Sequence, residues 1–177
     1  MKKSFLLILI VALLFPFAVC AEEEILLPEA EPSVAWIGND ELAFINRQDY
    51  YDLSYKYPGE FELEIKEDSD RTRHVLSYFS EGYEKPAVKL VISRTNEYTP
   101  ETRLTDVSFI DQITAEEING VPWIVGTQTD TSNGSVTIYV CGAGEYTYTF
   151  TFSSDYPADF DFSAFAEAFI REVKPAL

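Results

Sequence analysis

Residues 145–152 constrain the fold more than any other segment, because they alternate strictly between two kinds of side chain. Aromatic residues fall on one face of an extended chain and threonines on the other: Tyr146, Tyr148, Phe150 and Phe152 against Thr147, Thr149 and Thr151. Both kinds of residue favour β-strands. We therefore predict a strand whose aromatic face packs in a core while its threonine face meets water.

Six further segments are predicted to be strands of the same sheet. They are residues 52–57, 61–66, 74–79, 87–93, 121–128 and 135–141. Asn119-Gly120 and Asn133-Gly134 predict two-residue hairpin turns, and Gly142-Ala143-Gly144 predicts a third turn. Residues 67–73 are expected to form a charged loop. Short hairpins join antiparallel neighbours, so we predict an antiparallel sheet of about seven strands.

Helices are expected to cover one face of this sheet. Pro100-Glu101 can open a short helix that reaches about Gln112. A C-terminal helix is indicated by an aromatic stripe at helical spacing, formed by Phe162, Phe165, Phe169 and Val173. Asp159 or Asp161 can cap that helix, and Lys174-Pro175 ends it. The predicted fold class is α+β, an antiparallel sheet with helical cover that includes a C-terminal helix.

The N-terminus is typical of a secretory signal peptide over residues 1–21. Lys2 and Lys3 precede the apolar run 5–17, and Val19-Cys20-Ala21 supplies the small residues that a signal peptidase reads. This predicts an extracytoplasmic protein, secreted or in the cell envelope, with no transmembrane segment in the mature chain. Lipidation of Cys20 is an alternative, which Phe17 and Val19 match poorly.

The sequence predicts that the chain has three parts. The signal peptide is followed by residues 22–49, an acidic tether with Pro28 and Pro32 and then a hairpin or edge strands within 34–45. Residues 50–177 form the predicted domain. Once residues 1–21 are removed, Cys141 is the only cysteine, so no intrachain disulfide is possible and the fold must rely on its core.

The order of features from Tyr50 to Lys174 resembles the PsbP-like fold. The segments that carry the resemblance are 53–58 with Phe61, Asn119-Gly120-Val121-Pro122-Trp123, the strand 146–153 and the closing helix. This group includes the extrinsic P subunit of photosystem II and bacterial envelope proteins of the DcrB type. The resemblance implies a binding scaffold or adaptor without a shared active site. No functional residue is carried over, since fold analogy does not transmit function.

Charge excludes one class of partner. The chain has 13 Lys and Arg against 30 Asp and Glu, a net charge of −17. A sequence-independent nucleic-acid binder needs clustered Lys and Arg to neutralise phosphates, so no nucleic-acid partner is expected. The same balance argues against electrostatic binding to a membrane surface.

No constellation of catalytic residues emerges from the sequence. His74 is the only histidine, and we interpret it and Cys141 as strand residues rather than a catalytic dyad, because an acidic chain offers little to lower a thiol pKa. A zinc site within one chain is excluded by the same shortage of His and Cys. A Gly-x-Ser-x-Gly elbow is absent, and Gly142-Ala143-Gly144 is not a phosphate loop.

Clustered carboxylates are the second group of residues to consider as catalytic groups or metal ligands. Glu60, Glu62 and Glu64 share a strand face, Glu67, Asp68 and Asp70 follow, and residues 130–134 bear a faint likeness to a calcium loop. We interpret them as solvated surface, with Arg71 and Arg73 as their intramolecular partners. We therefore predict no catalytic, cofactor-binding or metal-binding residues and no cofactor.

Aromatic residues could also line a carbohydrate or peptide groove. Alternation places Trp123 on the same strand face as Val125, which indicates the core, whereas Trp36 is the better candidate for an exposed aromatic.

The function favoured by these observations is a non-enzymatic binding or adaptor domain, with a protein or cell-envelope component as partner. The alternative is an extracellular hydrolase that uses carboxylates, with or without calcium. An accessory subunit of a surface assembly, marked by a broad apolar patch, is a third possibility. The sequence leaves the binding residues and the oligomeric state open.

Overall fold

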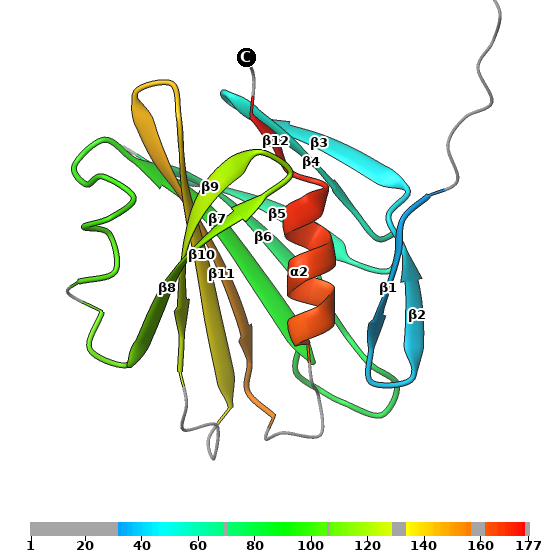
Figure 1. Cartoon of the computed structure of the whole chain (residues 1–177). Helices are drawn as coiled ribbons and strands as arrows, with labels where there is room; N and C mark the ends of the chain where they lie inside the picture. Colours follow the sequence, from blue (N-terminus) through cyan, green and yellow to red (C-terminus); the bar gives the residue numbers. More distant parts are fainter. Residues whose placement is uncertain (1–31, 69–70, 106, 129–133, 157–161, 176–177) are drawn as a thin grey trace, which may run out of the picture. The chain divides into compact units, whose positions relative to one another are not determined.

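The computed structural model describes residues 32–68, 71–105, 107–128, 134–156 and 162–175 (Figure 1). These residues belong to one compact unit, Pro32–Leu177. The expected signal peptide, Cys20 and residues 22–31 of the expected tether lie outside the described residues. No helix in the described part of the chain is long and apolar enough to span a membrane.

The largest element is a seven-stranded antiparallel sheet with the order β5-β6-β7-β11-β10-β9-β8. Its strands are β5 (Glu62–Asp68), β6 (Arg71–Tyr78), β7 (Val88–Thr95), β8 (Gln112–Ile118), β9 (Val121–Thr127), β10 (Ser135–Ala143) and β11 (Tyr146–Ser154). Asn119 and Gly120 form the two-residue turn between β8 and β9, with φ of 53° and 76°. Those positive values explain the Asn-Gly pair, as a primed turn requires them.

Two small sheets and a helix complete the described fold. One sheet pairs β1 (Val34–Ile37) with β2 (Asp40–Ala43), and the other has the order β12-β4-β3, with β3 (Asn46–Tyr50), β4 (Leu53–Tyr57) and β12 (Lys174–Pro175). The helix α2 spans Ser163–Arg171 and lies in front of the large sheet, beside β1 (Figure 1).

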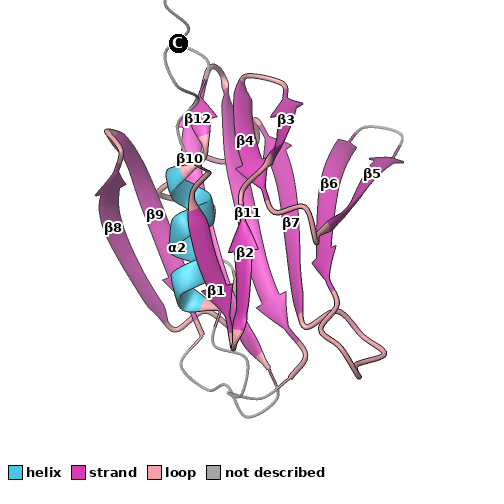
Figure 2. Cartoon of the chain, turned by 90° about the vertical axis from the view of Figure 1, so that its right-hand side faces the viewer, coloured by secondary structure: helices cyan, strands magenta, loops and turns pink. Residues whose placement is uncertain are grey.

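The predicted α+β class with helical cover is wrong, because the described chain is mostly β (Figure 2). Among the described residues α2 is the only helix, and β1–β2 and β3–β4–β12 pack on the core where helical cover was expected. The PsbP-like, α+β architecture therefore does not describe this structure. Strands substitute for helices here because short apolar segments can bury one face in either conformation.

The helix expected over residues 100–112 is absent. This segment forms successive turns, with backbone N–H groups of Thr102, Thr105 and Ile110 donating to the carbonyl three residues earlier. Its threonine hydroxyls also bond to nearby carbonyls, as Thr105 does to Thr102. Such local bonds compete with a helix. The chain then enters β8, a strand that the sequence pattern did not indicate.

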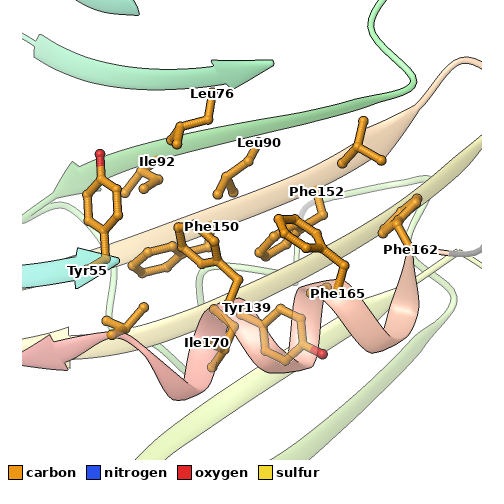
Figure 3. Close-up of a cluster of buried hydrophobic side chains, with 14 of the residues drawn as sticks. Tyr55, Leu76, Leu90, Ile92, Tyr139, Phe150, Phe152, Phe162, Phe165 and Ile170 are labelled. Atoms are coloured by element: carbon orange, nitrogen blue, oxygen red, sulfur yellow. The ribbon is translucent and has the colours of Figure 1, made fainter. Parts of the chain in front are cut away.

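The main core lies between the inner face of the large sheet and the layer formed by α2 and the small sheets. Phe165 of α2 is fully buried and stacks against Phe61 and Phe44, with ring centroids 5.0 and 5.8 Å away. Phe169 contacts Phe150 and Phe152 of β11. Figure 3 shows the rings of Phe150, Phe152 and Phe165 in the same cluster as Leu76, Leu90 and Ile92 of β6 and β7. The stripe predicted for the last helix is thus confirmed as its buried face.

Residues 34–50 are part of this core. Ile37, Leu42 and Phe44 are at most 1% exposed, and Tyr50 is 2% exposed. The hairpin expected within 34–45 is present as β1–β2, with Ala35 paired to Leu42. The compact unit accordingly begins near Pro32, whereas the sequence pattern placed the start of the domain at residue 50.

The outer face of the large sheet is only partly open. Thr147 and Thr149 of β11, expected to meet water, are each 3% exposed because residues 98–103 lie over them. The Thr147 hydroxyl donates to the Tyr98 carbonyl oxygen at 2.6 Å. Leu104 packs beside them on Ile138 and Val140 as a second apolar cluster. On the outer face of β6 and β7, Lys89 is exposed and Ser77 and Ser93 are half-buried, whereas Val75 is buried.

The charged loop predicted over residues 67–73 is largely a hairpin arm. Glu67 and Asp68 continue β5, and β6 starts at Arg71, with Asp68 paired to Arg71 and Lys66 to Arg73. The Asp68–Arg71 pair and the Asp68–Arg73 ion pair bring opposite charges together across the two strands and favour this extension over a loop, although Lys66 and Arg73 are like charges directly opposite each other. As a result, Asp68, Arg71 and Arg73 take fixed positions on the outer face, where they help to form the candidate site.

Candidate functional site

A pocket of about 520 Å³ opens where the β3–β4 turn meets the ends of β5, β6 and β7. We call it the arginine–tyrosine pocket; its main side chains are Tyr51, Asp68, Arg71, Arg94, Glu97 and Tyr146. Thr72, Thr95 and Asn96 add polar groups to its wall. The lining therefore joins guanidinium groups, phenol rings and hydroxyls.

Arg94 is held between two tyrosine rings. Its guanidinium carbon lies 3.2 Å from the centroid of the Tyr51 ring and 4.1 Å from that of Tyr146. Contact between a guanidinium and an aromatic face is attractive and fixes the orientation of the planar group. Within the described part of the chain, no carboxylate pairs with Arg94. Its N–H donors are therefore oriented but not neutralised.

The backbone at Tyr51 is strained. Tyr51 has a φ of 55° in the two-residue turn between β3 and β4, a region that bulky residues rarely adopt. Its hydroxyl donates to the Thr72 Oγ1 atom at 3.0 Å, and its ring packs edge-on against Tyr50. Strain of this kind, about 1–3 kcal/mol, persists only where the surroundings enforce it and is concentrated at functional sites.

Asp52, the second residue of this turn, ties it to the large sheet. Its backbone N–H donates to the Tyr148 hydroxyl oxygen, and the Tyr148 hydroxyl donates to Asp52 Oδ2, both at 3.3 Å. Burial raises the pKa of Tyr148, so the hydroxyl keeps its proton for this bond. Both residues of the turn are thus hydrogen-bonded to the large sheet, Tyr51 through Thr72 and Asp52 through Tyr148.

A second hollow of about 330 Å³ continues the pocket onto the outer face of the sheet. It shares Asp68, Arg71 and Arg94 with the pocket and adds Arg73 and Arg103. Four of the six arginines in the chain line the pocket or this hollow, although the whole chain carries a charge of −17. Their side chains do not share one face, because Arg94 follows Leu90 and Ile92 on the core side of β7 whereas Arg103 donates to Thr149 on the outer side of the sheet.

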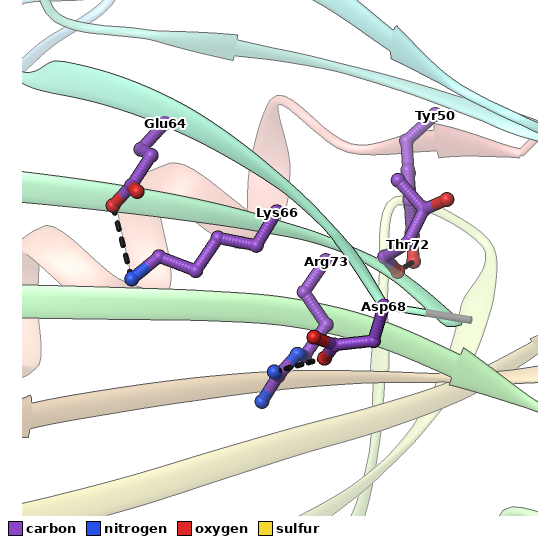
Figure 4. Close-up of polar contacts among 6 residues, drawn as sticks. All are labelled: Tyr50, Glu64, Lys66, Asp68, Thr72 and Arg73. Atoms are coloured by element: carbon purple, nitrogen blue, oxygen red, sulfur yellow. Dashed lines mark hydrogen bonds and ion pairs between the residues drawn. The ribbon is translucent and has the colours of Figure 1, made fainter. Parts of the chain in front are cut away.

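Among the described residues, the carboxylates in this region offset only part of the arginine charge. Asp68 forms an ion pair with Arg73 (Figure 4), and Glu97 lies 3.9 Å from Arg71. The Nε atom of Arg73 is buried and has no hydrogen-bond partner among the described residues. A buried donor without an acceptor is costly. Such a cluster can bind an oxyanion, since guanidinium forks match carboxylate, sulfate and phosphate groups.

His74 lies in the core next to this region but outside the pocket. It is 3% exposed, and its Nδ1 atom is 2.7 Å from the Tyr55 hydroxyl. Its ring also packs against Tyr50, with centroids 4.4 Å apart. Burial lowers the pKa of His74, so the neutral imidazole is favoured. His74 is thus a buried residue within β6, where the sequence pattern had placed it at the start of a strand.

Cys141 is buried on β10, separated from His74 on β6 by the strands β7 and β11. Burial raises the pKa of its thiol to about 12. The structure therefore does not bring these two residues together, and the thiol stays protonated at neutral pH.

The carboxylates singled out by the sequence spread along the edge of the sheet. Glu62 and Glu64 lie on β5, where Glu64 is 3.1 Å from Lys66, and Arg73 pairs with Asp68 as expected (Figure 4). Arg71 lies 3.9 Å from Glu97, a carboxylate outside the run that the sequence singled out. Among the described residues, no three His, Cys, Asp or Glu side chains gather as a metal site. Asp70 and residues 130–133 lie outside the described part of the chain.

Both tryptophans lie where they were expected. Trp123 is 1% exposed and packs against Phe150, whereas Trp36 on β1 is 51% exposed. Neither lines the arginine–tyrosine pocket.

Sequence reasoning missed the arginine–tyrosine pocket. Its residues come from the β3–β4 turn, from β6 and β7 and from the start of β11, so no local motif marks them. One signal was present in the sequence: the arginines are few and four of them fall between residues 71 and 103.

Comparisons with known proteins assign this chain to no family. No protein-family model matches it, and no curated protein does. Among solved structures it is similar to a crystal structure from Bacteroides thetaiotaomicron VPI-5482, with 12% sequence identity and a TM-score of 0.47. The match covers 70% of this chain and 45% of that chain.

Proposed function

We propose that the protein is a non-enzymatic, extracytoplasmic binding domain that holds an oxyanion group of its ligand in the arginine–tyrosine pocket. The observation that carries this proposal is Arg94, whose guanidinium is oriented by Tyr51 and Tyr146 and has no carboxylate partner among the described residues. The extracytoplasmic location rests on the N-terminal sequence alone.

Preorganisation supports this role for Arg94. An arginine that already has a fixed orientation loses little side-chain entropy when a ligand binds, so more of the interaction free energy appears as affinity. Arg71 lines the same pocket and supplies a second positive charge. Together they favour a carboxylate, sulfate or phosphate over a neutral group.

The surroundings favour binding over hydrolysis. The Cys141 thiol is buried and protonated, and the His74 imidazole contacts Tyr55 in the core. Asp68 and Glu97, the carboxylates of the pocket, each have an arginine partner.

Isothermal titration with galacturonate, sulfate and inorganic phosphate at constant ionic strength tests the proposal. We expect saturable binding of at least one of these anions, and a loss of about tenfold in affinity for Arg94→Lys, which keeps the charge but lacks the fork. Arg47→Lys is the matched control, since Arg47 is exposed on β3 and outside the pocket. Absence of saturable binding, or equal affinity of Arg94→Lys and wild type, would contradict the proposal.

A further inference from the structure

The strand β8 leaves one edge of the large sheet unpaired. It is the last strand of the sheet, and among the described residues it pairs only with β9 (Figure 1). Residues 112–117, all of β8 except its last residue, are exposed. The edge of a sheet presents unpaired backbone N–H and C=O groups, which can pair with another strand unless the edge is protected.

The two edges of the sheet differ in their protection by charge. Five of the seven residues of β5, the strand at the other edge, are charged, and such charges oppose the addition of a further strand. β8 has two charged residues, Glu116 and Glu117, and both lie near its end. Its first four residues, Gln-Ile-Thr-Ala, are uncharged. β8 is therefore the edge that is open to another strand.

The turn after β8 determines which backbone groups face this edge. Residues 119–120 form a two-residue hairpin turn, so the flanking residues Ile118 and Val121 exchange backbone hydrogen bonds with each other. Hydrogen-bonded and non-hydrogen-bonded pairs alternate along an antiparallel ladder. The N–H and C=O groups of Ile113 and Ala115 consequently point away from β9, toward the free edge.

The side chains of β8 differ in character between the two faces of the sheet. Ile113 and Ala115 lie opposite Gly126 and Ile124, on the outer face, where Ile124 belongs to the second apolar cluster. Ile113 is 50% exposed. The residues between them, which lie on the inner face, are polar: Gln112, Thr114 and Glu116.

We infer that β8 pairs with β8 of a second copy of this chain, antiparallel and with the twofold axis at Thr114. This register places Ile113 opposite Ala115 of the second copy, and the outward backbone groups of these residues then exchange hydrogen bonds. It also places Gln112 opposite Glu116 of the second copy. β8 contributes no residue to the arginine–tyrosine pocket, so the inference stands independently of the proposed function.

Self-complementarity is the reason to assign this edge to a second copy. In the proposed register an amide faces a carboxylate, two apolar side chains face each other, and two threonine hydroxyls meet at the axis, all of which are favourable cross-strand pairs. An axis at Ala115 would instead place Ile113 opposite Glu117. Twofold dimers with the same surface on both subunits are also the commonest protein oligomers.

Like charges oppose the dimer at its ends. The register places Glu117 opposite Asp111 of the second copy, and each copy has a net charge of −17. Salt screens such repulsion, so association should tighten as the ionic strength rises. Weaker association in salt would mean that ion pairs hold the copies together and would overturn the inference.

Sedimentation equilibrium with variants of residue 115 tests the interface. We expect a concentration-dependent dimer, and association that is at least about tenfold weaker for Ala115→Pro, because proline removes an outward N–H and leaves the ladder with β9 intact. Ala115→Ser, which keeps the N–H, is the matched control. Cooperative thermal unfolding of Ala115→Pro verifies that this variant is folded.

Substitutions at Gln112 test the same contact without a change in the backbone. Gln112→Glu should weaken the dimer about threefold, since it faces Glu116 of the second copy, and Gln112→Lys should tighten it about threefold. Equal association of both variants would overturn the inference.

Disulfide trapping tests the register. Opposed residues of a non-hydrogen-bonded pair have Cα atoms about 4.5 Å apart, within the range of a disulfide. In the chain that starts at residue 22, which lacks Cys20, Thr114→Cys should therefore form a covalent dimer on mild oxidation. Cys141 is 0% exposed and does not compete. Glu116→Cys, on the same face but away from the axis, is the control.

Four outcomes would overturn the inference. The first is a protein that stays monomeric at every concentration up to about 1 mM, which would leave the edge to a different chain. The second is a dimer that is as tight in Ala115→Pro as in Ala115→Ser. The third is more crosslinking at residue 116 than at residue 114. The fourth is loss of the dimer when residues 22–31 are removed, which would assign the edge to that segment of the second copy.

Discussion

Arg94 of β7 lies with its guanidinium carbon 3.2 Å from the ring centroid of Tyr51, a residue in the turn of a different sheet. The contact joins the small β3–β4–β12 sheet to the end of the large sheet. The positive φ of Tyr51 destabilises the backbone of this turn, at the residue whose ring orients the Arg94 guanidinium. The pocket thus exists only when the two sheets are packed together.

Two substitutions at Tyr51 separate strain from ring contact. Glycine accepts a positive φ without strain, whereas alanine keeps most of the strain and loses the ring as well. We expect Tyr51→Gly to be more stable than Tyr51→Ala by about 1 kcal/mol, which urea unfolding can measure. Both variants should bind the anion of the pocket more weakly, since Arg94 loses one of its flanking rings. A Tyr51→Ala protein that is as stable as Tyr51→Gly would show that the turn is not strained.

Phe169 should be among the largest single contributors to stability. It is fully buried on α2 and contacts Phe44, Phe150 and Phe152. Phe169→Ala should lower the free energy of unfolding by about 3–5 kcal/mol, because it leaves a cavity in a core that repacks only partly. Phe109→Ala, at a residue that is 49% exposed, should change it by less than about 0.5 kcal/mol. Similar losses for the two variants would contradict the observed packing of α2.

The burial of His74 should make stability depend on pH. Its pKa is lowered in the folded state, so the unfolded chain binds the proton more readily and protonation favours unfolding. The contribution of neutral His74 to the free energy of unfolding is complete above about pH 6.5, the ordinary pKa of histidine. It is lost as the pH falls below that value, by at most about 1.4 kcal/mol per pH unit.

Urea unfolding near pH 7.5 and near pH 5.5 checks this dependence. The carboxylates titrate in wild type and in His74→Asn alike, so the difference in pH slope between the two proteins isolates His74. Wild type should lose more stability than the variant on acidification. The same slope in both proteins would mean that His74 is charged or solvated in the fold.

Truncation distinguishes the tether from the start of the core. Removal of residues 22–31 should change the melting temperature by less than about 5 °C, which at this size is about 1 kcal/mol or more. Removal of residues 22–45 takes away Ile37, Leu42 and Phe44, and should abolish the cooperative thermal transition. A chain that starts at Asn46 and still unfolds cooperatively would show that β1 and β2 are dispensable.

Local sequence patterns predicted the strands well where alternation was strict or a turn was explicit. The aromatic face of β11 is buried as expected, and Asn119-Gly120 forms the predicted hairpin turn. The helix stripe at Phe165 and Phe169 also follows from a local period. These features depend on residues close in the chain, so the order of side chains is sufficient to indicate them.

Other features were decided by packing between distant segments. The sequence of residues 100–112 did not indicate that turns would form instead of a helix. This segment follows the outer face of β9 and β10, where Leu104 packs against Ile138 and Val140. The same segment buries Thr147 and Thr149, which the alternation alone assigned to water.

The sequence by itself determined most strands of the large sheet, but not β8, together with the hairpin turn at Asn119-Gly120 and the buried stripe of the last helix, because each follows from a short-range period or a backbone preference. Only the tertiary structure decided that small sheets cover the core and that Arg94 meets Tyr51 and Tyr146. The physical reason is that a cation between two rings needs three segments brought together, and their separations in the chain contain no information about their distances in space.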